Sequence, residues 1–135
     1  TKVRGSSGRE WVGAIVIDHL GNIVVSAYAS GDIDGQVNQG DRDILVMKFD
    51  SVGDWQWSRL RGSSGRDSPG VNDLVCDSSG NIFLAGSTYE GFDGQSHSGG
   101  GGMDLVLMKF ATDGTWLWTR LRGNGDSNGE TTMGR

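Results

Sequence analysis

The segment DILVMKFDSVGDWQWSRLRG at residues 43–62 recurs as DLVLMKFATDGTWLWTRLRG at residues 104–123. Eleven of the 20 positions are identical at a constant spacing of 61 residues. Upstream, IDHLGNIVVSAYASGDIDGQ matches CDSSGNIFLAGSTYEGFDGQ at a spacing of 59, and RGSSGRE matches RGSSGRD at a spacing of 57. Each increase is a two-residue insertion, one near Ser68-Pro69-Gly70 and one in the run Gly99 to Gly102, where we predict loops. The chain is therefore an internal duplication.

Each unit contains four short strand candidates separated by turn sequences. In the second unit the candidates are 71–76, 81–88, 104–110 and 116–121, and the sequences DSSG and TDG between them suit tight hairpins. No segment has a sustained apolar period of 3.6 residues, so we expect almost no helix. The predicted fold class is all-β: two four-stranded antiparallel blades of a β-propeller with flanking partial strands, within a larger propeller or assembly.

Two tryptophan pairs occupy the last strand of each unit. Because Trp55 and Trp57, like Trp116 and Trp118, are two residues apart, we expect each pair to lie on one face of its strand. An indole covers a large area of a neighbouring sheet. We therefore predict that all four rings pack between blades and do not stack on a ligand.

Composition excludes several classes of protein. The 135 residues include 24 glycines and carry a net charge of −5, which argues against nucleic-acid binding. The recurring arginines are expected at a solvated strand edge; they are Arg4, Arg59, Arg61, Arg120 and Arg122. The single cysteine, Cys76, cannot form an internal disulfide and is expected to be buried. No apolar run is long enough to span a membrane.

The duplicated phrases also suggest how the chain is divided. We predict the end of a preceding blade at 1–5, a first blade at 6–62, a second at 63–123, and a tail or the start of a following blade at 124–135. The chain does not begin with Met, so we expect an excerpt of a longer or processed protein. Two blades cannot close a ring. The expected partners are further blades of the same longer chain or other copies, in a closed ring or a filament, and protein partners.

The phrase LRGSSGRDSPGVNDLVCDSSGNIFLAGST, followed by DLVLMKFATDGTWLW, resembles the β-propeller repeat family called SBBP. The resemblance extends over residues 1 to about 125. The first unit departs from the family pattern at Ala27-Tyr28-Ala29 and at Trp11. The resemblance implies propeller blades and, since such repeats occur in varied secreted or surface proteins, an extracellular or cell-surface location. It implies no single activity.

The loop GDIDGQVNQGDRD supplies the candidate ligand residues. Its oxygen donors are of the type that calcium prefers, although the spacing is not that of an EF-hand. The donors are Asp32, Asp34, Asn38, Asp41 and Asp43, matched in the second unit by Asp93 and Asp104. Turn formation is the favoured explanation, and Asp32, Asp34 and Asp93 are the calcium candidates. The loop tips Asp34-Gly35-Gln36 and Asp93-Gly94-Gln95 are the first choice for a small ligand.

Catalytic motifs are missing from the sequence. His19 and His97 lie in turns without metal-ligand spacing, and no HExxH, GxSxG or CxxC occurs. We expect no catalytic residue and no cofactor, calcium being the one alternative. The favoured hypothesis is a structural or protein-interaction module. The alternatives are a glycan- or calcium-binding lectin-like propeller, and a hydrolase whose active site lies in blades outside this chain.

Overall fold

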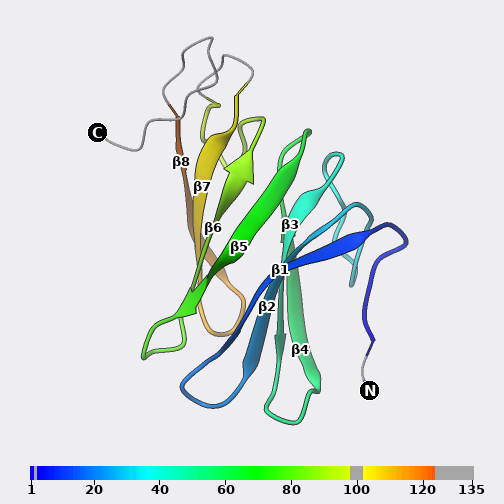
Figure 1. Cartoon of the computed structure of the whole chain (residues 1–135), viewed down its shortest axis with the longest axis vertical. Helices are drawn as coiled ribbons and strands as arrows, with labels where there is room; N and C mark the ends of the chain where they lie inside the picture. Colours follow the sequence, from blue (N-terminus) through cyan, green and yellow to red (C-terminus); the bar gives the residue numbers. More distant parts are fainter. Residues whose placement is uncertain (2, 98–101, 124–135) are drawn as a thin grey trace.

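The computed structural model describes residues 1, 3–97 and 102–123, and these form two four-stranded antiparallel sheets (Figure 1). Sheet 1 has the order β1-β2-β3-β4 and sheet 2 the order β5-β6-β7-β8. The strands are β1 (Glu10–Ile17), β2 (Ile23–Ala29), β3 (Asp43–Phe49), β4 (Trp55–Arg61), β5 (Asp67–Cys76), β6 (Ile82–Thr88), β7 (Asp104–Phe110) and β8 (Trp116–Arg122). The described residues contain no helix. The predicted all-β class with two four-stranded sheets is confirmed, and the architecture is consistent with blade-like units.

The predicted tight hairpins form for local reasons. Between β1 and β2, the carboxylate of Asp18 accepts the N–H groups of Leu20 and Asn22, while its carbonyl accepts the N–H of Gly21. Gly21 has a φ of 84°, which glycine adopts at little cost. Asp77 forms the same turn between β5 and β6. The repeated Asp-x-x-Gly-Asn sequence therefore sets the reversal in both sheets.

One predicted loop is instead part of a strand. The prediction started the first strand of sheet 2 at residue 71, whereas β5 starts at Asp67 and contains Ser68-Pro69-Gly70. In β1 a single irregularity separates Val12 from Ala14, while in β5 it separates Pro69 from Leu74. The two inserted residues enlarge this bulge and so leave the pairing on either side intact. Of the other predicted insertion, residues 99–101 lie outside the described residues, as does the predicted tail 124–135.

A second bulge corrects the prediction about the tryptophans. Lys48 pairs with Trp57 but Phe49 pairs with Trp55, so Gln56 is an extra residue in β4. Leu117 is the corresponding extra residue in β8. Since a bulge reverses the alternation of side chains, the two indoles of each strand lie on opposite faces and not on one.

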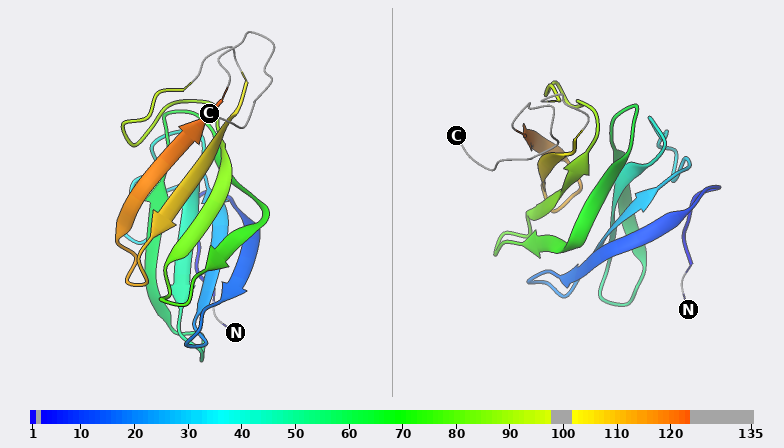
Figure 2. Two further views of the ribbon diagram at one scale, coloured as in Figure 1. Left: turned by 90° about the vertical axis from the view of Figure 1, so that its left-hand side faces the viewer. Right: turned by 45° about the horizontal axis from the view of Figure 1, so that its top comes forward.

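The two sheets pack face to face (Figure 2). The residues between them are mostly apolar. β5 lies against β1, β2 and β3. The inner face of sheet 1 carries Ala14, Val16, Val24, Ile44, Val46, Lys48, Trp57, Arg59 and Arg61. The inner face of sheet 2 carries Leu74, Cys76, Ile82, Leu84, Val106, Met108, Phe110, Trp116 and Leu121. The core therefore lies between the sheets.

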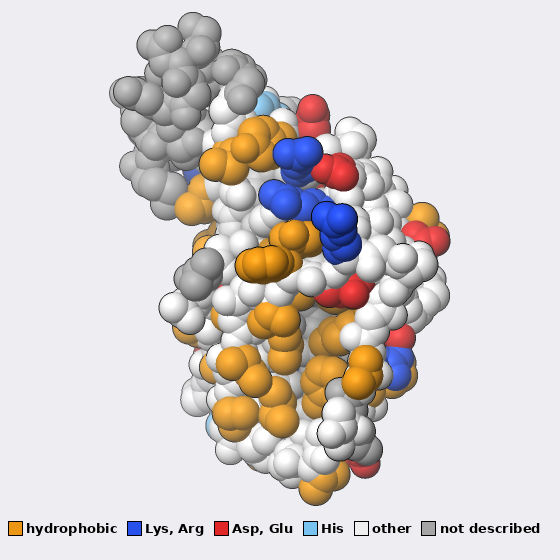
Figure 3. All heavy atoms as spheres, turned by 45° about the vertical axis from the view of Figure 1, so that its right-hand side comes forward, with side chains coloured by type: hydrophobic (Ala, Val, Ile, Leu, Met, Phe, Trp, Pro, Cys, Tyr) orange, Lys and Arg blue, Asp and Glu red, His pale blue; other side chains and the backbone are white. Residues whose placement is uncertain are grey.

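Each sheet also has an outer face, turned away from the other sheet. The outer face of sheet 1 carries Ile15, Ile17, Ile23, Val25, Leu45, Met47, Phe49, Trp55 and Leu60. The outer face of sheet 2 carries Val75, Phe83, Leu105, Leu107, Lys109, Trp118, Arg120 and Arg122. Figure 3 shows exposed apolar side chains spread over the side of the molecule that is turned forward there, below a group of Lys and Arg side chains.

The duplicated phrase RGSSGR lies immediately before the first strand of each sheet, and its second copy connects β4 to β5. In its second copy, the carboxylate of Asp67 accepts hydrogen bonds from the backbone N–H and the hydroxyl of Ser63. In the first copy, the carboxylate of Glu10 accepts the same two bonds from Ser6. An acidic residue in the first position of β1 or β5 therefore fixes the turn that precedes each sheet. The strands of sheet 1 fall within residues 6–62 and those of sheet 2 within 63–123.

Candidate functional site

The two loop tips proposed for ligand binding are tight turns. Ile33 and Gln36 exchange both backbone hydrogen bonds around Asp34-Gly35, which have φ values of 48° and 77°. Asp93 and Gly94 adopt the same conformation, with φ values of 53° and 73°. An Asp-Gly pair is favoured in two-residue turns that need positive φ. The side chain of Gln36 then bonds to the edge of β4, donating to the carbonyl of Ser58 and accepting from the N–H of Leu60.

The carboxylate of the second tip is held at the junction of the two sheets. Asp93 forms an ion pair with Arg61 from the end of β4, whose Nε lies 3.0 Å from Oδ2. The guanidinium of Arg61 also lies 4.0 Å from the centre of the Trp116 ring. Thr119 joins them, because its hydroxyl donates to Asp93 and accepts from Trp116 Nε1. An arginine of sheet 1 is thereby bound to an indole and a carboxylate of sheet 2.

The first tip makes the same contact with an arginine near the N-terminus. Arg4 forms an ion pair with Asp34 and lies 4.0 Å from the centre of the Trp55 ring. Ser58 takes the place of Thr119, since its hydroxyl donates to Asp34 and accepts from Trp55 Nε1. Arg4 matches Arg61 at the spacing of 57 residues, so it occupies on sheet 1 the position that Arg61 occupies on sheet 2.

The expectation that these arginines lie at a solvated strand edge is wrong for Arg61 and Arg59, which are half-buried, and Nε of Arg59 donates to the carbonyl of Gly114 at 2.7 Å. Arg4 is exposed, although its guanidinium is bound to Asp34 and lies over Trp55. The sequence contains a signal that the prediction did not use. The Arg-Gly phrase, the Asp-Gly-Gln tip and the first tryptophan of the last strand recur together in both units. Each arginine finds its partners about 30 and 50 residues away, beyond the range of local patterns.

The four tryptophans divide between the core and the outer faces. Trp57 is buried, and its Nε1 donates to the carbonyl of Thr112 at 3.2 Å. Trp116 packs against the same core from sheet 2. Trp55 is exposed on the outer face of sheet 1, and Trp118 lies edge-on to Phe83 on the outer face of sheet 2.

The calcium and small-ligand candidates are spread among different structural roles. Asp32 accepts the N–H of Asn38 at 2.8 Å, and Asp34 and Asp93 are in ion pairs. Within residues 1, 3–97 and 102–123, no group of three or more His, Cys, Asp or Glu side chains is arranged to hold a metal ion. Calcium binding and ligand binding at Gln36 and Gln95 stay predictions. A ligand at either tip would have to compete with the arginine already bound to the carboxylate.

The remaining polar candidates have local partners. Nε2 of His97 lies 2.9 Å from the carbonyl oxygen of Gly102 and 3.7 Å from the carboxylate of Asp104. Cys76 packs against the core between the sheets, and burial raises the pKa of its thiol.

In the part of the chain that the structure describes, no helix has the length and hydropathy needed to cross a bilayer.

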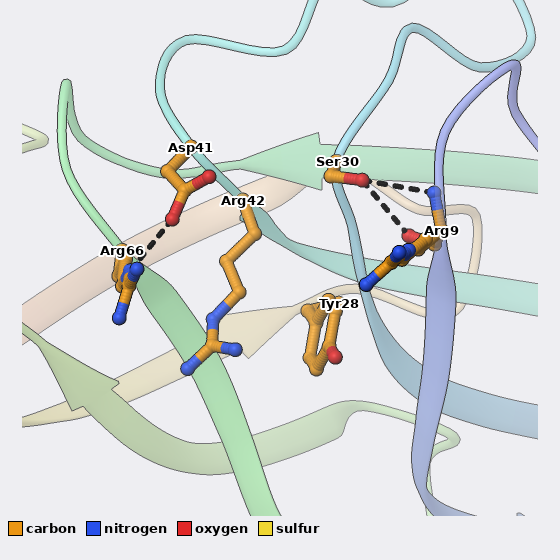
Figure 4. Close-up of a pocket in the computed structure, with 6 residues that line it drawn as sticks. All are labelled: Arg9, Tyr28, Ser30, Asp41, Arg42 and Arg66. Atoms are coloured by element: carbon orange, nitrogen blue, oxygen red, sulfur yellow. Dashed lines mark hydrogen bonds and ion pairs between the residues drawn. The ribbon is translucent and has the colours of Figure 1, made fainter.

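Three arginines line a hollow of about 270 Å³ where the loops before β1, β3 and β5 meet (Figure 4). The guanidinium of Arg42 lies 4.5 Å from the centre of the Tyr28 ring, and its buried Nε has no hydrogen-bond partner in the part of the chain that the structure describes. Arg66 pairs with Asp41 at 2.6 Å, and Arg9 is the third arginine. Guanidinium groups in this arrangement can donate hydrogen bonds to a bound carboxylate, sulfate or phosphate. Met103 stands at the position that matches Arg42, so the hollow is not part of the duplicated contact.

A pair of buried carboxylates lies at the crossing between the sheets. Asp43 and Asp67 are fully buried, and a Cβ added to Gly62 would lie 2.5 Å from one carboxylate and 2.6 Å from the other. Among the described residues, Oδ1 of Asp43 has no hydrogen-bond partner. Burial, together with the charge of Asp67, raises the pKa of Asp43 to about 6, although the N–H of Gln39 opposes this. Burial also raises the pKa of Asp67.

The substitution Asp43→Asn is expected to stabilise the protein at neutral pH. Because the folded protein binds this proton more tightly than the unfolded chain does, the wild type loses stability as the pH rises from about 4 through 6. A shift of about two pKa units corresponds to roughly 3 kcal/mol, most of which the substitution should recover. Urea unfolding between pH 4 and 8 measures it. Asp41→Asn is the control, because it removes an exposed carboxylate paired with Arg66 and should change the free energy of unfolding by less than about 1 kcal/mol. An equally steep decline with pH in Asp43→Asn would refute the assignment.

No protein-family model matches this sequence, and no curated protein matches it either. The resemblance to SBBP repeats therefore stays a prediction that depends on the motifs themselves.

Proposed function

We propose that this chain is a structural and protein-interaction module, formed by two blades of β-propeller type, that scaffolds an assembly through its outer faces. The observation that carries the proposal is a difference in exposure between matching residues. Ile15 on the outer face of sheet 1 is 67 % exposed, whereas Leu74, its match on the inner face of sheet 2, is 5 % exposed. An apolar side chain at the matching position is thus covered by a neighbouring sheet in one unit and exposed in the other.

The contrast extends across both outer faces. Ile17 is exposed where its match Cys76 packs against the core, and Val75 is exposed where its match Val16 packs against the core. Each outer face therefore has the composition of a surface that is covered elsewhere in the same molecule. Apolar surface of this kind is stabilised when another surface covers it, by about 25 cal/mol for each Å² removed from water.

The state of the loop tips also favours an interaction module over the lectin-like alternative. Both tip carboxylates are engaged by arginines, and the two contacts are alike in their residues and in their ring distance of 4.0 Å. A contact that repeats at each sheet is suited to joining one sheet to the next. The resemblance to SBBP repeats supports an extracellular or cell-surface location for such an assembly.

Sedimentation equilibrium tests the proposal. We expect the chain to show a mass above its monomer value of 14.4 kDa at micromolar concentration. A charge on either outer face, introduced by Ile17→Asp or Val75→Asp, should return it to the monomer with unchanged far-ultraviolet circular dichroism. Leu20→Asp is the control, because Leu20 is at least as exposed as Ile17 and Val75 but lies in the β1–β2 turn. A folded wild type that stays monomeric at high concentration would contradict the proposal.

A further inference from the structure

Within the chain, three side chains of sheet 1 form hydrogen bonds to one turn of sheet 2. Nζ of Lys48 lies 2.7 Å from the hydroxyl and 3.1 Å from the carbonyl oxygen of Thr112. The indole of Trp57 donates to the same carbonyl, and Nε of Arg59 donates to the carbonyl of Gly114. This turn joins β7 to β8. Its glycine, at φ 87°, lies directly beneath the indole, since an added Cβ would be 2.8 Å from Trp57 Cδ2.

The outer face of sheet 2 presents the same three residue types in the same register. Lys109, Trp118 and Arg120 match Lys48, Trp57 and Arg59 at the spacing of 61 residues. Their strand pairing is also the same, since Lys109 pairs with Trp118 as Lys48 pairs with Trp57. The Lys, Trp and Arg side chains that bind a turn between the two sheets are therefore repeated on the outer face of sheet 2, which faces away from sheet 1.

The turn between β3 and β4 has the same backbone conformation as the β7–β8 turn that Lys48, Trp57 and Arg59 bind. Asp50 donates its N–H to the carbonyl of Asp54 at 2.8 Å, just as Ala111 donates to Thr115. Gly53 has a φ of 88°, against 87° for Gly114. Ser51 stands in the place of Thr112 and keeps the hydroxyl. This turn lies at the edge of the outer face of sheet 1, next to Trp55.

We propose that a second copy of this chain docks head to tail, with the outer face of its sheet 2 on the outer face of sheet 1. This rests on the proposed function and names its partner. Lys109 of the docking copy reaches Ser51, Trp118 covers Gly53, and Arg120 binds the carbonyl of Gly53. The contact is heterologous, because it joins two different faces, so it can continue into a ring or a filament.

Arg4 competes with the docking copy. The residue that matches Arg4 and Arg61 in the docking strand is Arg122, and its partners would be Asp34 and Trp55. Arg4 of the receiving copy already holds both of these groups. Head-to-tail docking therefore displaces Arg4 from the outer face of sheet 1, and the segment around Arg4 acts as an internal competitor for the docking site.

Cross-linking determines the orientation. In a Cys76→Ala background, Lys109→Cys protein is mixed with Ser51→Cys protein and treated with a short bismaleimide. A covalent dimer is expected from the mixture and not from either protein alone. If the wild type associates but the mixture gives no dimer, or if Lys109→Cys cross-links to itself, the head-to-tail arrangement is wrong while the proposed function stands. A wild type that does not associate rejects both.

Titration of the association tests the competition. Removal of residues 1–4, or Arg4→Ala, is expected to tighten association by about five- to tenfold, since a partly exposed ion pair and a cation–π contact no longer have to be broken. Arg9→Ala removes an exposed charge outside the face and should leave affinity unchanged. Trp118→Ala should weaken association at least about tenfold. Weaker association after removal of residues 1–4, or full affinity in Trp118→Ala, would overturn the proposal.

Discussion

Replacement of Trp57 by alanine is expected to lower the free energy of unfolding by about 3–5 kcal/mol, the usual cost of deleting a buried aromatic side chain. Trp57 is 8 % exposed, lies in the core between the sheets and donates its Nε1–H to Thr112. Its removal opens a cavity against Gly114 and leaves the carbonyl of Thr112 without the indole donor. Chemical unfolding at low protein concentration, where association does not contribute, measures the loss.

The duplication supplies a matched control for this substitution. Trp118 occupies the same position in β8 but lies on the outer face of sheet 2, half-buried against Phe83. Trp118→Ala is expected to cost only about 1 kcal/mol, because neither of the two described sheets packs over the outer side of the ring. Equal losses in the two variants would show that burial between the sheets does not determine the stability.

Replacement of Lys48 by methionine is expected to cost a similar amount, about 3–5 kcal/mol, because it leaves a buried carboxylate without its cation. Nζ of Lys48 lies 3.0 Å from Oδ2 of Asp18, and both side chains are almost fully buried. Burial acts to raise the pKa of Asp18, but hydrogen bonds from Asn22 and Lys48 outweigh it and lower the pKa to about 2. The pair therefore stabilises the protein above pH 4, and the stabilisation is lost as the pH falls toward 2.

A double-mutant cycle separates the charge from the packing. Asp18→Asn keeps an oxygen that can accept the N–H groups of Leu20 and Asn22. Combined with Lys48→Met, it should recover at least half of the loss, since no uncompensated charge remains. Lys109→Met is the control on the outer face and should cost less than about 1 kcal/mol. If the double variant is less stable than Lys48→Met alone, the buried charge is not the cause.

Short-range patterns account for the parts of the fold that were predicted correctly. The strand predicted at 104–110 has the bounds observed for β7, and the other three of its unit differ by one to four residues at an end. Their turns form from contacts within five residues, such as the hydrogen bonds that the N–H groups of Ser79 and Asn81 donate to the carboxylate of Asp77. Because those contacts are local, the sequence between the strands was sufficient to place them.

The predictions were wrong where the position of a residue depends on the strand register or on a partner far away in the sequence. An extra residue at Gln56 or Leu117 cannot be recognised from alternation, because the pattern W-x-W looks the same with or without a bulge. The inserted residues near Pro69 were predicted as a loop because they fall between apolar segments, where loops tolerate added length, whereas β5 contains them as a bulge. The partners of Arg61 lie on the other sheet and could not be identified from neighbouring residues.

The sequence by itself determined the duplication, the all-β class, the four strands of each unit and the turns between them, because all of these depend on residue spacing and on contacts along a few residues of chain. Only the tertiary structure decided which face of each sheet is covered. That choice depends on two bulges and on a sheet-to-sheet contact between residues more than 50 positions apart, such as Trp57 and Thr112. In that contact, Arg61 and Trp57 of sheet 1, which the sequence shows only as members of a repeated pattern, bind residues of sheet 2 and so join the two sheets.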